Sequence, residues 1–172
     1  MEEIEVKILE IDKKAMVRKL LKMGAKKTFE GTIVSDSYDY PDGRIGKADS
    51  LVRLRKQGAR TYLTFKRKII NPKAKVRDEQ EVEVEDFDTM KNILSGIGLV
   101  RKNGITKTRE SYLLGYVKYE IDEIKGIPVF MEVEAPTFKK LEGAVHKLGF
   151  EMDRTSSMGT GELLAKYKKT HV

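Results

Sequence analysis

The sequence predicts an α+β fold dominated by one antiparallel sheet or barrel, with a few helices packed against it. Long stretches alternate polar and apolar residues with the period of two that is typical of strands. Short links such as Gln57-Gly58-Ala59 and Leu114-Gly115 suit hairpin turns between them. Three other stretches carry apolar residues at helical spacing. The predicted strands are 2–10, 31–40, 50–57, 60–68, 76–86, 104–113, 116–124 and 128–135.

The predicted helices cover residues 12–23, 87–97 and 138–148, and each has one apolar stripe. Each begins at a residue whose side chain can accept a hydrogen bond from the first helical turn: Asp12, then Asp86 or Asp88, then Thr137. Gly24, Gly98 and Gly149 follow the helices, at the position where glycine commonly ends a helix.

The composition limits the function. The chain has 172 residues, 40% hydrophobic and 35% charged, which suits one domain over residues 1–172. No apolar run approaches the roughly 18–20 residues of a membrane span, so we expect no membrane partner. Cysteine is absent, which excludes thiolate chemistry and fits a cytoplasmic protein. With only His146 and His171 available, a bound metal would be a hard cation on carboxylates, such as Mg²⁺, Mn²⁺ or Ca²⁺.

Charged residues of the predicted strands lie on one face, because alternate side chains of a strand point to opposite sides. Two folds explain this pattern. An open sheet could expose its charged face to water. Alternatively, the sheet closes on that face and places both signs of charge in a lumen, with the helices outside. Mixed charges in a lumen suit a metal-bound polyphosphate, and the net charge of +7 agrees with an anionic ligand.

An ordered series of motifs resembles the CYTH superfamily, also called the triphosphate tunnel metalloenzymes. The first motif is Glu3-Ile4-Glu5-Val6-Lys7, which looks like an E-x-E-x-K signature. The second is the stretch from Asp36 to Arg44, which contains Pro41-Asp42-Gly43. The series continues with Arg53 and Arg55, Leu63-Thr64-Phe65-Lys66, Arg77 with Glu79 and Glu81, Lys107 and Arg109, Asp122, and Glu132 with Glu134.

The resemblance implies one CYTH domain: a closed antiparallel barrel of about eight strands with a charged tunnel and Mg²⁺ or Mn²⁺ as cofactor. It implies phosphate binding by Lys7, Arg53, Arg55, Lys66, Lys107 and Arg109, and metal binding by Glu3, Glu5, Glu79, Glu81, Glu132 and Glu134. The residues expected to be catalytic are Glu5, Lys7 and Asp122. Lys68, Glu83, Glu85 and Glu120 share the same face, and we expect them at the tunnel mouth or surface.

Three functions remain open. A class IV adenylyl cyclase would convert ATP to cyclic AMP and pyrophosphate, and the tail from Ser156 to Leu164 resembles that branch. A triphosphatase would hydrolyse thiamine triphosphate, inorganic triphosphate or nucleoside triphosphates. A non-catalytic protein would bind polyphosphate or RNA, but the tyrosines do not cluster with the arginine pairs, which disfavours a nucleic-acid partner. The sequence is compatible with a homodimer.

Overall fold

The computed structural model describes residues 2–69 and 75–168, without the side chains of residues 2, 3, 75 and 168. The predicted role of Glu3 therefore lies outside the described side chains. Within the described residues, five α-helices and one 3₁₀ helix are interspersed among the strands: α1 (Lys13–Lys22), α2 (Arg44–Lys47), α3 (Phe87–Gly96), α4 (Phe138–Lys147), η1 (Met152–Arg154) and α5 (Thr160–Lys168). Among the described residues, no helix is long and apolar enough to cross a membrane.

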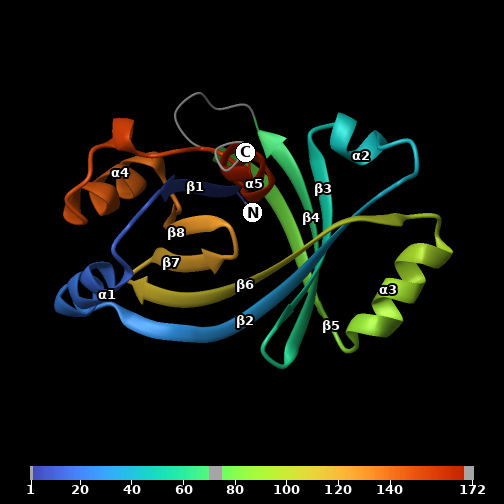
Figure 1. The fold of residues 1–172 in the computed structure, drawn as a ribbon, viewed down its shortest axis with the longest axis horizontal. Coiled ribbons are helices and arrows are strands. Elements are labelled where there is room, and N and C mark those ends of the chain that lie inside the picture. The colour runs from blue at the N-terminus through green and yellow to red at the C-terminus, as the bar shows by residue number, and fades with distance from the viewer. Residues whose placement is uncertain (1, 70–74, 169–172) are drawn as a thin grey trace. The chain divides into compact units, whose positions relative to one another are not determined.

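The strands form one closed antiparallel barrel (Figure 1). They pair in the order β1-β5-β4-β3-β2-β6-β7-β8 and then return to β1. This order confirms the closed barrel and excludes the open sheet. The strands are β1 (Glu2–Ile8), β2 (Lys26–Asp39), β3 (Ser50–Gln57), β4 (Arg60–Ile69), β5 (Lys75–Val84), β6 (Val100–Leu114), β7 (Val117–Ile124) and β8 (Ile127–Ala135).

The chain divides into two compact units, and the first is built mainly from residues 31–69 and 77–107. In this unit α3 covers the apolar face of its strands. Leu94 of α3 is buried against Leu54, and Leu63 packs at the edge of the same cluster. Residues that pair directly across antiparallel strands point to the same side. The pairs Arg53↔Thr64 and Arg55↔Tyr62 therefore lie on the face away from α3.

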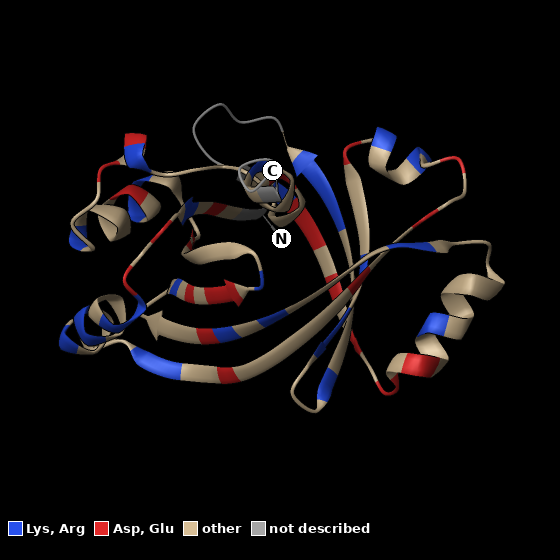
Figure 2. Ribbon diagram, in the orientation of Figure 1, with Lys and Arg blue, Asp and Glu red and all other residues tan. Residues whose placement is uncertain are grey.

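The second unit is built mainly from residues 3–30 and from Thr108 onward. Val6 pairs with Val133 on its apolar face, where Leu20 of α1 and Leu141 of α4 bury the strands. The alternate pairs Glu5↔Glu134 and Lys7↔Glu132 belong to the opposite face. In both units the helices thus cover the apolar side of the strands, as the sequence predicts, and both signs of charge occur along the strands (Figure 2).

A polar cluster, here called the Glu110 cluster, joins α1 to β2 and β6 within the second unit. The Glu110 carboxylate lies 2.7 Å from Lys13 Nζ and 2.9 Å from Lys27 Nζ. It also accepts a 2.7 Å hydrogen bond from the Tyr112 hydroxyl. Burial would raise the pKa of Glu110, but these three donors outweigh it and lower the pKa to about 2. Glu110 is therefore an ionised, buried anchor for α1.

The helix ends follow the predicted chemistry. Asp12 accepts a hydrogen bond from the Ala15 amide, Asp86 from Thr89, and Thr137 from Lys140. The glycines after these helices have left-handed φ values of 85°, 90° and 82°, which other residues rarely adopt.

Two strands begin several residues earlier than predicted. β2 begins at Lys26 instead of residue 31, and β6 begins at Val100 instead of residue 104. The added ends are mostly exposed on both faces, so they lack the alternation on which strand prediction depends. The short helices α2 and η1 were likewise not among the predicted elements.

Candidate functional site

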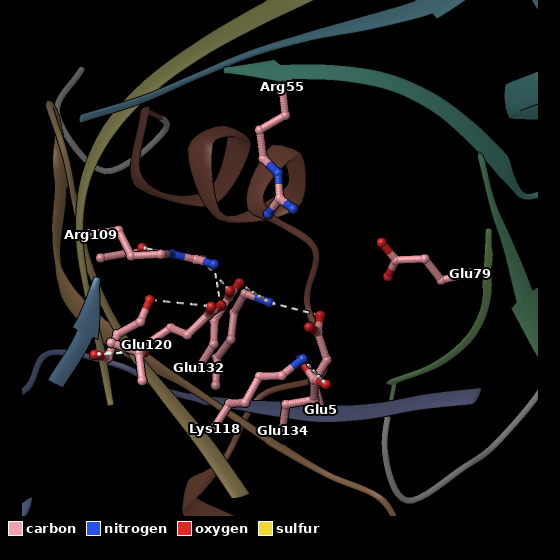
Figure 3. Close-up of polar contacts among 12 residues, drawn as sticks. Glu5, Arg55, Glu79, Arg109, Lys118, Glu120, Glu132 and Glu134 are labelled. Atoms are coloured by element: carbon pink, nitrogen blue, oxygen red, sulfur yellow. Dashed lines mark hydrogen bonds and ion pairs between the residues drawn. The ribbon is translucent and has the colours of Figure 1, made fainter. Parts of the chain in front are cut away.

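The second unit contains a buried acidic and basic cluster, here called the Arg109 cluster. It consists of Glu5 and Lys7 of β1, Arg109 of β6, Glu120 and Asp122 of β7, and Glu132 of β8. The antiparallel register brings these residues together, since Arg109 pairs with Asp122 and Glu120 pairs with Glu132. Figure 3 shows the Arg109 side chain directed toward Glu132 with Glu120 beside it.

Arg109 is at the centre of this cluster and is only 4% exposed. Its guanidinium binds the fully buried Asp122 in a two-point contact, with Nε 2.6 Å from Oδ1 and Nη2 2.5 Å from Oδ2. Nη2 also lies 2.5 Å from Glu132 Oε2, and Nη1 donates to Glu120. Burial alone would lower the pKa of Arg109, but the surrounding carboxylates raise it well above its ordinary value. The planar fork of Arg109 therefore fixes the positions of three carboxylates.

Lys7 is the other cation of the cluster and is 1% exposed. Its Nζ lies 2.9 Å from Glu132 Oε1 and 3.3 Å from Glu5 Oε1. Burial alone would lower the pKa of Lys7, but the attraction of Glu132 and Glu5 outweighs burial and raises the pKa. Lys7 therefore stays protonated, so it can bind an anion but cannot accept a proton.

The tail of the chain holds the backbone of Lys7. The amide of Lys7 donates to the Ser156 carbonyl at 2.8 Å, and the Ser156 amide donates to the Lys7 carbonyl at the same distance. Farther along the tail, Leu163 is completely buried and the Tyr167 hydroxyl donates to Glu10 at 2.7 Å. The bridge at Ser156 therefore fixes this part of the tail on the strand that carries Glu5 and Lys7.

The first unit contains a more basic cluster, here called the Arg55 cluster. It consists of Arg53 and Arg55 of β3, Thr64 and Lys66 of β4, and Glu79 and Glu81 of β5. Arg55 Nη2 lies 3.1 and 3.0 Å from the two oxygens of Glu81, which also accepts from the Thr64 hydroxyl at 2.7 Å. Lys66 Nζ lies 2.6 Å from Glu79.

The cations exceed the carboxylates in the Arg55 cluster, so the cluster suits an anion. Burial would raise the pKa of Glu81, but Arg55 and the Thr64 hydroxyl outweigh it, and the pKa is lowered. Arg53 makes longer contacts: its Nη2 donates to the Thr64 hydroxyl at 3.4 Å and lies 3.7 Å from Glu79 and 3.5 Å from Glu81. Its Nε is buried and has no hydrogen-bond acceptor among the described residues. A buried donor of this kind is costly unless a ligand completes its hydrogen bonding.

Comparison with known proteins identifies the family. A family model of the CYTH domain matches residues 1–158. The chain belongs to the CYTH family. This confirms the resemblance drawn from the motifs.

Relatives of this CYTH protein include enzymes by name. A protein of Methanocaldococcus jannaschii named "putative adenylate cyclase" is 32% identical over 135 residues, which are 77% of this chain and 75% of that protein. The solved PH1819 protein of Pyrococcus horikoshii is 26% identical with a TM-score of 0.80, covering 95% of this chain and 98% of that one. A Hippeastrum structure described as a "putative adenylyl cyclase" with dominant triphosphatase activity has a TM-score of 0.68 at 17% identity, covering 95% of each chain. At that identity the last likeness shows the fold alone.

The structure separates the predicted site residues of this CYTH protein into groups. Glu5, Lys7, Arg109, Asp122 and Glu132 meet in the Arg109 cluster, whereas Arg53, Arg55, Lys66, Glu79 and Glu81 meet in the Arg55 cluster. Glu134 is farther from Arg109 and contacts the half-exposed Lys118 at 2.8 Å. Lys107 lies on β6, two residues before Arg109, and is half-buried.

One placement was wrong. We expected Glu120 at the tunnel mouth or surface, but it contacts Arg109 directly. Its side chain is 20% exposed, compared with 48% for Lys68 and 55% for Glu83. The alternation of side chains along the strand gave the correct face for Glu120. Its depth along the barrel depends on the register between strands, which the alternation within one strand does not supply. The expectation that no tyrosine lies with the arginine pairs was also wrong, because Tyr62 pairs with Arg55 and its ring centroid is 5.2 Å from that guanidinium. Its position two residues before Thr64 and four before Lys66 places it on the same face of β4, so this spacing could have identified it.

The donor chemistry of the Arg109 cluster fits a hard divalent cation. Its carboxylates outnumber its cations, and Glu5 and Glu132 each have an oxygen near Lys7. In the described part of the chain, no three acidic or histidine side chains are arranged to hold a metal by themselves. Mg²⁺ sites at phosphate-processing centres commonly use only one or two protein carboxylates, with substrate phosphates and water as the other ligands. The residues therefore fit a metal that binds together with its phosphate ligand.

Proposed function

We propose that this CYTH protein is a metal-dependent enzyme that acts on a triphosphate, and that it converts ATP to cyclic AMP and pyrophosphate. The excess of cations in the Arg55 cluster, with the incompletely bonded guanidinium of Arg53, is the observation that carries the proposal. The name of the 32% identical relative supports the choice of cyclisation.

We assign phosphate binding to Arg53, Arg55 and Lys66, with Lys7, Lys107 and Arg109 as further predicted contacts. Guanidinium groups can hold two phosphate oxygens at once, and a lysine adds a point charge. In the free protein Arg53, Arg55 and Lys66 contact the two carboxylates Glu79 and Glu81. A bound phosphate would therefore compete with those two glutamates for the same donors.

Cyclisation needs an attacking oxygen, a proton acceptor and a stabilised leaving group. The ribose 3′-oxygen attacks the α-phosphorus, the bond from that phosphorus to the α–β bridging oxygen breaks, and pyrophosphate leaves. We assign Glu5 to accept the 3′-hydroxyl proton and Lys7, which stays protonated, to stabilise negative charge on phosphate oxygens. Asp122 holds Arg109 in place through its two-point contact.

A bound Mg²⁺ or Mn²⁺ would act as a Lewis acid on the phosphate oxygens. We assign Glu132 to hold it, with Glu5 and Glu134 as further predicted ligands. The predicted ligands Glu79 and Glu81 belong to the basic cluster, so we regard them as the weaker candidates.

Hydrolysis by the same residues is the second candidate. Water would attack the terminal phosphorus, and the bond to the β–γ bridging oxygen would break. The dominant triphosphatase activity stated for the Hippeastrum protein motivates this alternative. The third candidate is a non-catalytic protein that binds polyphosphate or RNA.

Product analysis separates these candidates. Purified protein would be incubated with Mg²⁺ or Mn²⁺ and, in parallel, ATP, thiamine triphosphate and inorganic triphosphate. Cyclic AMP with pyrophosphate supports cyclisation, whereas free phosphate supports hydrolysis. Binding of the triphosphates without turnover, under all metal conditions, would overturn both enzymatic candidates and favour the binder.

A matched pair of variants tests the site itself. Lys66 and Arg67 are neighbours on β4 that point to opposite faces. Lys66 belongs to the Arg55 cluster, whereas Arg67 is 65% exposed and contacts Asp78. Lys66→Ala should therefore abolish most turnover, while Arg67→Ala should leave it unchanged. Equal effects of the two substitutions would show that the Arg55 cluster is not the phosphate site.

A further inference from the structure

Tyr62 places an aromatic ring on the charged face of β4. It lies on the same face of the strand as Thr64 and Lys66, both of which contact the glutamates of β5. Its direct partner across the β3–β4 pair is Arg55. The neighbouring Leu63 points to the other side, where it packs in the apolar cluster beneath α3. Tyr62 is therefore an aromatic side chain in a polar setting, separate from the core of its unit.

Arg55 contacts Tyr62 and Glu81 with the same guanidinium. The guanidinium carbon lies 5.2 Å from the centroid of the Tyr62 ring, within cation–π range. Its Nη2 is fixed by both oxygens of Glu81, at 3.1 and 3.0 Å. Because Tyr62 is half-buried rather than enclosed, part of its surface can still meet a ligand.

The order of residues along β4 gives Tyr62 a place relative to the phosphate-binding groups. On this face Lys66 is followed by Thr64, then Tyr62 and then Arg60, toward the turn between β3 and β4. Strand geometry places Tyr62 about 13 Å along the chain from Lys66. A ligand whose phosphates lie between Lys66 and Arg55 would thus place its next group beside the Tyr62 ring.

We propose that Tyr62 stacks on an aromatic ring attached to the triphosphate and makes the protein prefer such ligands over inorganic triphosphate. The inference rests on the proposed function and specifies its substrate class. The shared chemistry is a flat aromatic group, which could be a purine base or the aromatic part of thiamine. A tyrosine face accepts either by stacking, and it makes no such contact with inorganic triphosphate.

The test compares three ligands on four variants. Dissociation constants for ATP, thiamine triphosphate and inorganic triphosphate would be measured by equilibrium titration at low temperature, with products analysed in the same samples. The variants are Tyr62→Leu, Tyr62→Gln and Tyr62→Phe, with Phe65→Leu as the matched control. Phe65 is 40% exposed on the same strand and points to the opposite face. Melting temperatures establish that each variant is folded, and the glutamine variant replaces the leucine variant if that one misfolds.

Tyr62→Leu should weaken the binding of ATP or thiamine triphosphate roughly 5- to 150-fold, the range for loss of one stacked base. It should leave the dissociation constant for inorganic triphosphate unchanged, and Tyr62→Phe should bind all three ligands as the wild type does. The organic ligand that loses affinity identifies the aromatic group. The control Phe65→Leu should change none of the three constants.

Other outcomes overturn the inference in distinguishable ways. An equal loss for all three ligands would mean that Tyr62 only positions Arg55. No loss for any ligand would mean that the ring makes no contact. If the wild type binds inorganic triphosphate but neither organic ligand, the inference fails and the triphosphate site stands. If it binds none of the three, the proposed function fails as well.

Discussion

Replacing Glu110 by glutamine should remove a pH-dependent part of the folding free energy. Glu110 is 8% exposed, and its pKa is lowered from 4.5 to about 2 by Lys13, Tyr112 and Lys27 acting against burial. Because the folded pKa is below the unfolded one, this stabilisation is complete above pH 4.5 and is lost as the pH falls toward 2. A difference of this size corresponds to about 3 kcal/mol at pH 7 and about 1 kcal/mol at pH 3.

The assay is denaturant unfolding of the wild type and Glu110→Gln at both pH values. Comparing the two proteins cancels the contribution of the other carboxylates, provided that these groups are unaffected. Glu30→Gln is the control, because Glu30 contacts the same Lys27 at 2.7 Å but its side chain is 62% exposed. That change should cost about 0–1 kcal/mol. A Glu110→Gln effect of equal size at pH 7 and pH 3 would refute the assignment of the cluster as an ionic anchor.

Three further predictions concern the two clusters. Arg55→Ala should weaken the binding of inorganic triphosphate roughly 10- to 100-fold in titrations, since it removes charged hydrogen bonds, while Arg67→Ala should leave binding unchanged. Similar dissociation constants for the two variants would contradict this prediction. Arg109→Met should lower the free energy of unfolding by about 3–5 kcal/mol in denaturant, because buried carboxylates lose their guanidinium. A loss below about 1 kcal/mol would contradict the central role of Arg109 in the cluster. In the presence of inorganic triphosphate, Mn²⁺ should raise the melting temperature of the wild type more than that of Glu132→Gln, and equal shifts would exclude Glu132 as a ligand.

The alternation of charged and apolar residues along the strands predicted more of this fold than any other feature of the sequence. It identified the face of β1 that carries Glu5 and Lys7, and the face of β3 that carries Arg53 and Arg55. These predictions succeed because one side of each strand packs on a helix, so a shift of one residue would bury charge. The N-caps Asp12, Asp86 and Thr137 were predictable for a similarly local reason, since each bonds an amide three residues away.

The grouping of the site residues could not be predicted in the same way. Lys7 meets Glu132 through the pairing of two strands that are distant in the sequence, β1 and β8, whereas Arg109 meets Asp122 across the β6–β7 hairpin. Their register depends on turns, on loops and on the closure of the barrel, which single-strand patterns do not report. For the same reason the sequence could not show that Glu79 and Glu81 are held by basic residues, or that Glu120 reaches Arg109.

The bridge between Lys7 and Ser156 has a consequence for how the protein is made. Strand β1 leaves the ribosome early, yet its partners at Lys7 are Glu132 and Ser156, which are translated more than a hundred residues later. Until then β1 has one unpaired edge, and Lys7 has Glu5 beside it but lacks Glu132. Contacts of such long sequence separation slow folding and prolong the exposure of strand edges to other chains. The surroundings of Lys7 should therefore be completed only after translation has passed Ser156, and ribosome-bound chains stalled before that point should be selectively prone to aggregation.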